Sequence, residues 1–196
     1  GNAVATVGNI MAQPLLFRLS ILSALLTPIV TASVAFFLYK LFKPVNKNQA
    51  TLMVIFTLAA TPIAMLNEIN HFAVLLLLNG ADYLKVVSVD QLYSQVMFFL
   101  DLSHYGAFIA AIFWGLWLLP LGYLIFKSNF IPKLIGILII VAGLGYLVDS
   151  VALFLLPGLN IDMSQFTFIG EVLLLLWLLI KGVNAKQWEK RALESA

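Results

Sequence analysis

The sequence predicts an all-α polytopic membrane protein, a bundle of transmembrane helices, and three observations carry this prediction. Hydrophobic residues make up 62% of the 196 positions and charged residues only 10%, and the mean hydropathy is +1.03. A soluble domain is typically about 45–50% apolar and about 25% charged. The apolar residues also form continuous runs of roughly 20 residues or more, the length that a helix needs to cross a hydrocarbon core about 30 Å thick.

Five apolar stretches meet this length, and we expect one transmembrane helix in each. Membrane strands would be shorter and would alternate polar with apolar residues, so the continuous runs favour helices. We expect one helical domain over residues 1–196. The expected spans are residues 19–42, 51–79, 93–126, 133–156 and 165–184.

The segments outside these spans have their own expected roles. Residues 1–18 are amphipathic and are expected to lie at the membrane interface. Residues 80–92 could hold a short helical turn, with Ser88 or Asp90 available to cap the helix that follows. Residues 157–164 could form a similar turn.

The distribution of Lys and Arg predicts the orientation, because cytoplasmic loops carry an excess of these residues. Nine of the eleven fall on one side of the expected bundle, and only Arg18 and Lys85 fall on the other. The N-terminus of this chain is therefore predicted to lie outside and the C-terminus in the cytoplasm. The nine residues are Lys40, Lys43, Lys47, Lys127, Lys133, Lys181, Lys186, Lys190 and Arg191.

The chain begins Gly1-Asn2-Ala3-Val4, with no initiator Met and no signal-peptide pattern. An N-terminus outside the membrane needs an export element, and a further transmembrane helix upstream would supply it. We therefore expect a six-helix parent protein with both ends in the cytoplasm.

The residue types and motifs that the sequence lacks exclude several kinds of site. With no cysteine, the chain can form no disulfide, thiolate metal site or redox dithiol. It has no glycine-rich phosphate loop, no Gly-x-Ser-x-Gly turn, no His-Glu-x-x-His helix and no extended basic face, so nucleic acid is not an expected partner. The expected partners are the lipid bilayer and a lipid or small-molecule substrate.

Ionisable residues inside the expected spans form the candidate site. Such groups are costly to place in a bilayer and are functional-site hypotheses by default. An acid precedes a histidine by three residues in two of the helices, which places each pair on one helix face. The six residues are Glu68, His71, Asp101, His104, Asp149 and Glu171.

The two acid–His segments run in opposite directions through the membrane and resemble each other over six residues. A pseudo-two-fold axis in the membrane plane would set Glu68 opposite His104 and His71 opposite Asp101. That arrangement serves a metal site, because di-iron and di-manganese bundles take an acid–x–x–His pair from two helices and one carboxylate from each of two others. Iron, zinc or manganese would suit these ligands, although the known pattern has Glu at two positions where this chain has Asp.

Other interpretations of the same residues stay open. The six side chains could form a structural polar network, since such networks perturb ionisable groups much as active sites do. They could also form a proton or cation pathway of a transporter or sensor, which polar neighbours could extend. A haem held by His71 and His104 is disfavoured, because the nearby carboxylates would crowd a porphyrin. The polar neighbours are Asn67, Asn70, Ser103, Tyr105, Tyr146 and Ser150.

No residue is assigned a catalytic role by the sequence, and whether the protein is an enzyme stays open. If it is a metalloenzyme, the metal would activate water or oxygen, with a carboxylate or Tyr105 moving protons and a lipid or small molecule entering from the outer leaflet.

Several runs along nearly the whole chain carry a resemblance to a known family. They are Leu16–Ser20, Leu38–Asn46, Asn70–Ala73, Gly122–Ser128, Gly143–Ser150, Gly170-Glu171 and Trp177–Val183. In these runs and their order the chain resembles the bacterial membrane-protein family named domain of unknown function 4386. The resemblance implies a six-helix integral membrane protein with one helix ahead of Gly1, in a bacterial inner membrane. It implies no catalytic residue, because the family's activity is not established.

Overall fold

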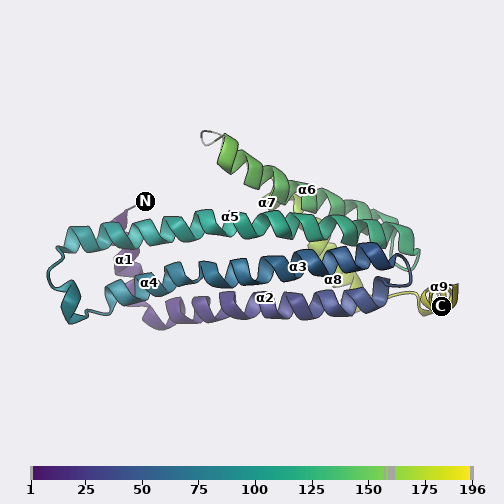
Figure 1. Ribbon diagram of the computed structural model, residues 1–196, viewed down its shortest axis with the longest axis horizontal. Coiled ribbons are helices and arrows are strands. Elements are labelled where there is room, and N and C mark those ends of the chain that lie inside the picture. The colour runs from purple at the N-terminus through teal and green to yellow at the C-terminus, as the bar shows by residue number, and fades with distance from the viewer. Residues whose placement is uncertain (1, 157, 159–161, 195–196) are drawn as a thin grey trace. The chain divides into compact units, whose positions relative to one another are not determined.

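The computed structural model describes residues 2–156, 158 and 162–194, and all regular secondary structure within them is helical (Figure 1). The predicted all-α fold is confirmed. In chain order the elements are α1 (Ala3–Ala12), α2 (Pro14–Phe42), α3 (Lys47–Asn67), α4 (Ile69–Leu78), the 3₁₀ helix η1 (Asp82–Leu84), α5 (Val89–Ser128), α6 (Lys133–Leu155), α7 (Ser164–Thr167), α8 (Ile169–Ile180) and α9 (Ala185–Glu194).

Four segments of the described chain are helical, long and apolar enough to cross a membrane, and all four match predicted spans. The fifth predicted span, 165–184, corresponds to the segment Ser164–Ile180, which contains α7 and α8. Helix α9 follows this segment after a bend of 100°, and the bent pair counted as one span brings the number of spans to five. The protein is therefore a polytopic helix bundle. The four segments are Pro14–Phe42, Lys47–Leu78, Val89–Ser128 and Lys133–Leu155.

The chain divides by its internal contacts into two compact units. Unit 1 comprises Gly1–Val30 and Thr61–Ile109, and unit 2 comprises Thr31–Ala60 and Ala110–Ala196. Helices α2, α3 and α5 therefore each contribute residues to both units. The single domain expected over residues 1–196 stays a prediction.

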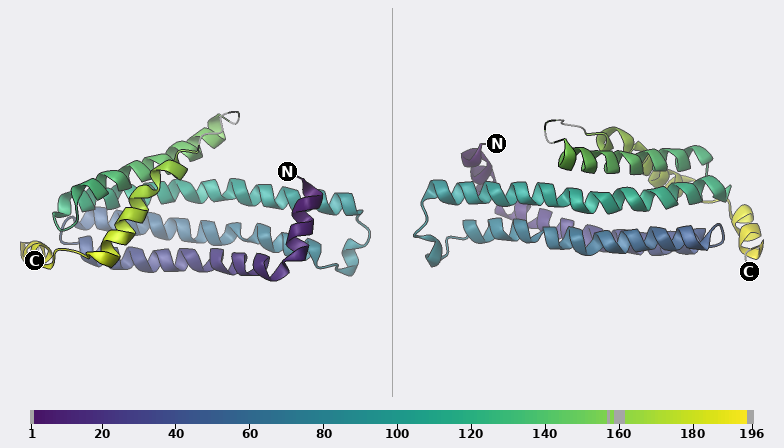
Figure 2. Two further views of the ribbon diagram at one scale, coloured as in Figure 1. Left: turned by 180° about the vertical axis from the view of Figure 1, so that it is seen from behind. Right: turned by 45° about the horizontal axis from the view of Figure 1, so that its top comes forward.

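Unit 1 has a small apolar core to which helices far apart in sequence contribute. Val7 of α1, Val74 of α4 and Val96 of α5 are fully buried, and Phe17 of α2 packs against them. Helix α1 meets the start of α2 at a steep angle, with the turn at Gln13 between them (Figure 2). The amphipathic lead-in predicted over residues 1–18 thus forms α1 and the first turn of α2, which begins with a proline, a residue favoured at the first helical position.

The predicted cap of the long helix α5 is confirmed at Ser88. The Ser88 hydroxyl accepts a hydrogen bond from the Gln91 N–H at 3.3 Å, and Gln91 Oε1 accepts one from the Ser88 N–H at 3.2 Å. This reciprocal pair is a capping box, which satisfies two backbone donors at the helix start. The expected helical turn over residues 80–92 is the 3₁₀ helix η1.

Unit 2 contains the larger apolar core, built from α2, α3, α5, α6 and α8. Phe42 at the end of α2 is fully buried and stacks on Phe130, with ring centroids 5.6 Å apart. Helix α9 turns away from α8 (Figure 2) and is held to the bundle by Trp188, whose Nε1 donates to the Leu41 carbonyl at 2.9 Å. The turn predicted over residues 157–164 falls partly on 157 and 159–161, which lie outside the described residues.

Two pairs of glycines bring α5 and α6 into close contact within unit 2. A Cβ added at Gly115 would lie 2.7 Å from the Gly143 carbonyl oxygen, and one at Gly143 would lie 2.8 Å from the Gly115 oxygen. Gly122 and Gly136 face each other in the same reciprocal way, at 2.6 and 2.7 Å. Small residues let membrane helices approach until their backbones touch, so these four glycines set the spacing of the two helices.

Candidate functional site

The break between α3 and α4 lies at Glu68. The Glu68 N–H donates to the Met65 carbonyl three residues earlier, at 3.2 Å, while the Glu68 carbonyl accepts from the Phe72 N–H at 3.1 Å. A hydrogen bond over three residues is tighter than the α-helical bond over four. Helical structure continues through Pro62 to Asn67, so the irregular turn falls on the acidic residue.

Glu68 and His71 form the acid–His pair that their spacing predicts. His71 Nδ1 lies 2.8 Å from Glu68 Oε2. The Glu68 side chain is 9% exposed and the His71 side chain 28% exposed, so the carboxylate is the more deeply buried partner. A carboxylate acceptor on Nδ1 places a proton on that nitrogen, which leaves Nε2 to bond elsewhere.

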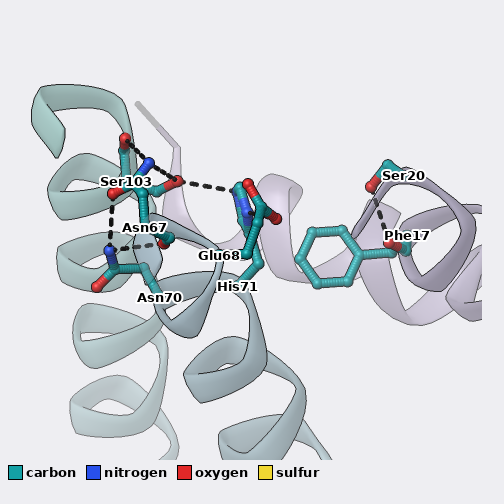
Figure 3. Close-up of polar contacts among 7 residues, drawn as sticks. All are labelled: Phe17, Ser20, Asn67, Glu68, Asn70, His71 and Ser103. Atoms are coloured by element: carbon teal, nitrogen blue, oxygen red, sulfur yellow. Dashed lines mark hydrogen bonds and ion pairs between the residues drawn. The ribbon is translucent and has the colours of Figure 1, made fainter. Parts of the chain in front are cut away.

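Ser103 of α5 is the partner of the second ring nitrogen. Its hydroxyl lies 3.3 Å from His71 Nε2 (Figure 3). The same segment of α5 is tied to α3 by Asn67, whose Nδ2 donates to the Ser103 carbonyl at 2.8 Å. Asn70 Nδ2 in turn donates to Asn67 Oδ1 at 3.1 Å. We call these five residues the Glu68–His71 network: Asn67, Glu68, Asn70, His71 and Ser103.

The network depends on two residues that carry no charge. A Cβ added at Gly106 would lie 2.1 Å from Asn67 Oδ1, so only glycine leaves room for the amide that bonds Ser103. Phe17 of α2 meets the His71 ring edge to face, with centroids 5.8 Å apart (Figure 3). Phe17 is not among the site residues predicted from the sequence, because nothing in its own segment signals the contact.

The helical segments that carry the network are as long as a membrane crossing requires. Helix α3 has 21 residues from Lys47 to Asn67, about 32 Å at 1.5 Å per residue. The stretch of α5 from Ser103 to Lys127 is about 36 Å long by the same measure. A hydrocarbon core is about 30 Å thick, so each of these two segments is long enough to cross it.

Asp101 and His104 do not meet the Glu68–His71 pair in the way the pseudo-two-fold arrangement predicts. Both are exposed on α5, and the His104 ring contacts its helix neighbours Tyr105 and Phe108, at centroid distances of 5.6 and 5.3 Å. The face of α5 that meets His71 carries Ser103, so the cross-helix pairing expected between the acids and histidines is corrected to His71 with Ser103.

Asp149 of α6 accepts hydrogen bonds from the backbone at the start of α7, in unit 2. Its two carboxylate oxygens accept the Met163 N–H at 2.6 Å and the Ser164 N–H at 2.7 Å. The residue is 4% exposed. Helix starts leave backbone N–H groups without partners, and a carboxylate here satisfies two of them while complementing the helix dipole.

Glu171 of α8 has a different environment in the same unit. The Tyr146 hydroxyl of α6 donates a hydrogen bond to its carboxylate. One carboxylate oxygen, Oε1, is shielded from solvent and has no hydrogen-bond partner among the described residues.

The six predicted metal ligands thus have distinct surroundings. Glu68, His71, Asp101 and His104 belong to unit 1, whereas Asp149 and Glu171 belong to unit 2. Among the residues that the structure describes, no three His, Asp or Glu side chains are grouped so as to hold a metal ion. Metal binding by the six residues stays a prediction, to which this geometry adds no support.

The fold and the site define the class as a polytopic all-α membrane protein with a histidine–carboxylate network built into apolar helices. Comparison with known sequences then places the chain in a family. The chain belongs to the family described as Domain of unknown function (DUF4386), whose model matches residues 1–182.

A relative from an archaeon is also similar to this chain. An uncharacterized protein of Archaeoglobus fulgidus is 34% identical over 163 residues, which cover 83% of each chain. No solved structure matches significantly. The similarity extends to an archaeal protein, so the bacterial inner membrane named by the resemblance stays a prediction.

Proposed function

We propose that the Glu68–His71 network is the proton-handling site of a proton-coupled membrane transporter or sensor. The observation that carries the proposal is that each ring nitrogen of His71 has a polar partner, Glu68 at 2.8 Å and Ser103 at 3.3 Å. A hydroxyl can donate to a neutral imidazole or accept from a charged one. The same contacts therefore support His71 in both protonation states.

The surroundings also suit a group that exchanges protons. Glu68 is the charged side chain in contact with His71, while Phe17 faces it from α2 and Ser103 from α5. The His71 side chain is not fully enclosed by the protein, and the more buried Glu68 can stabilise the imidazolium. Acid and histidine chains of this kind are the usual relay groups in membrane transporters.

Proton movement in vesicles tests this proposal. The purified full chain is reconstituted with a pH-sensitive dye in the lumen, and the lumenal pH is followed after a pH step. We expect proton movement by the unaltered chain and a loss of about a hundredfold in Glu68→Gln and His71→Gln, the lower end of what a positioned proton-transfer group contributes. His104→Gln is the matched control, because it removes the other histidine, which is exposed on α5.

The outcomes distinguish a site that handles protons from a polar network that only stabilises helix packing. Equal proton movement in all variants would overturn the proposal and favour a network that only specifies helix packing. No movement in the unaltered chain would exclude the transporter, and a thermal unfolding temperature that then depends on pH no more in the unaltered chain than in His71→Gln would exclude the sensor as well. Thermal unfolding of each variant in detergent accompanies the assay, so a loss of movement counts only where the fold survives.

The same preparation checks the metal prediction. Plasma mass spectrometry measures iron, zinc and manganese in the unaltered chain and in a His71→Ala, His104→Ala double variant. A stoichiometric metal that disappears in the double variant would favour a metalloprotein over the proton site.

A further inference from the structure

A small cleft in unit 2 lies beside Glu171. Its volume is about 180 Å³, and α2, α5, α6 and α8 all contribute to its lining. Leucine and other apolar side chains make up nearly all of that lining. Among the described residues that line the cleft, Glu171 is the one that can carry a charge.

The Tyr146 hydroxyl donates a hydrogen bond to the Glu171 carboxylate, which leaves one carboxylate oxygen to be satisfied. Glu171 Oε1 is buried without a hydrogen bond, and no Lys, Arg or His among the described residues forms an ion pair with it. Glu171 is partly buried, and an ionised carboxylate in apolar surroundings is costly without a counter-ion, so a bound cation would stabilise it.

The mouth of the cleft favours a ligand that dissolves in lipid. Val34 and Leu175 line it and are 45% and 58% exposed, on helices whose outer faces are apolar. Trp117 also lies in the lining, and an indole ring attracts cations through its negative face. The ligand is therefore expected to be an organic cation with an apolar body.

We propose that this cleft binds a small lipophilic ammonium ion from the bilayer, with Glu171 as its counter-ion and Trp117 as an aromatic wall. The volume limits the size of the ligand, since a protein cavity of about 150 Å³ holds a benzene molecule. The ammonium end of a ligand fits that limit, and a ring attached to it would lie at the mouth beside Val34 and Leu175. The site is independent of the Glu68–His71 network, which belongs to the other unit.

Benzyltrimethylammonium is a suitable probe, and neopentylbenzene is its uncharged counterpart of the same shape. Binding to the full chain in lipid nanodiscs is measured by saturation-transfer NMR. We expect saturable binding of the ammonium ion, weakened about tenfold or more in Glu171→Gln, which corresponds to about 1.4 kcal/mol. Neopentylbenzene should not distinguish the two proteins, because it has no charge for Glu171 to attract.

Two further variants make the test specific. Glu189→Gln removes the same charge from an exposed position on α9 and should bind the ammonium ion as the unaltered chain does. Leu175→Trp narrows the mouth at an exposed position, so it should weaken binding with Glu171 intact. Equal binding by Glu171→Gln and the unaltered chain, or no saturable binding by the unaltered chain, would overturn the proposal.

Discussion

Asp149, Glu171 and Glu68 carry the same functional group and meet three different surroundings. Asp149 accepts two backbone N–H groups, Glu68 accepts from an imidazole, and Glu171 keeps one oxygen without a partner. A buried carboxylate is stable only where donors or cations replace its water. Asp149 and Glu68 are satisfied by the chain itself, whereas Glu171 is hydrogen-bonded by Tyr146 and keeps Oε1 without a partner, so it is the one of these three left to meet a ligand.

The role of Asp149 leads to a stability prediction. Asp149→Ala removes both acceptors from the Met163 and Ser164 N–H groups at the start of α7, and hydrogen bonds to charged groups contribute about 1.5–3 kcal/mol each. We expect a loss of about 3 kcal/mol in the free energy of unfolding, measured by titration with a denaturing detergent.

Asp101→Ala is the control for this prediction. Asp101 is exposed, and surface substitutions usually change stability by less than about 0.5 kcal/mol. If Asp101→Ala destabilised the chain as much as Asp149→Ala, the assignment of Asp149 as the specific support of α7 would be wrong.

At the scale of the secondary-structure elements, glycines set the distance between α5 and α6. Each glycine of the two pairs lies against a carbonyl oxygen of the facing helix. The hydrophobic effect that drives helices together in soluble proteins is absent between helices in lipid, so close packing of their backbones stabilises the contact instead. The spacing of Gly115 and Gly122 on α5 matches that of Gly143 and Gly136 on α6, which fits two helices that run antiparallel.

Gly122→Ala tests this packing. The added Cβ would lie 2.6 Å from both the Gly136 oxygen and Ile140 Cγ1, and part of this obstacle is backbone. We expect a loss of about 1–3 kcal/mol, the usual cost of overpacking, in the same detergent titration.

Gly8→Ala is the matched control for the α5–α6 contact. A Cβ added at Gly8 meets nothing within 4 Å, and alanine is favoured over glycine in a helix by about 1 kcal/mol. The control should therefore be neutral or stabilising. A stable Gly122→Ala variant would mean that the glycine pairs do not limit the approach of the two helices.

At the scale of the whole molecule, the long apolar helices and their lysine-bearing ends predict a topology. The chain has no cysteine, so single substitutions can be labelled without background. With a membrane-impermeant maleimide on intact cells, we expect Lys85→Cys to react and Lys133→Cys and Lys186→Cys to react only after permeabilisation, as the positive-inside rule requires.

The labelling has two informative alternatives. Reversed labelling would overturn the orientation and leave the fold intact. The predicted topology has an odd number of membrane crossings between Lys85 and each of Lys133 and Lys186. Labelling of all three positions from one side would contradict it.

The sequence alone determined the long apolar helices, their approximate spans and the Glu68–His71 pair, but it did not predict the break at Glu68 or helix α9. The predicted features depend on local properties: runs of apolar residues, a capping signal at Ser88 and a spacing of three residues that places two side chains on one helix face. The helix ends differed by a few residues, as α5 shows by beginning at Val89.

Only the tertiary structure decided which groups meet. The rotation of α5 about its axis turned Ser103, between Asp101 and His104, toward His71, and Gly106 made room for Asn67. The Asp149 carboxylate accepts a hydrogen bond from the backbone of a segment 14 residues further along the chain. Glu171 lines an apolar cleft to which four helices contribute. Helix rotation and approach are set by packing between residues distant in sequence, so a local pattern cannot specify them.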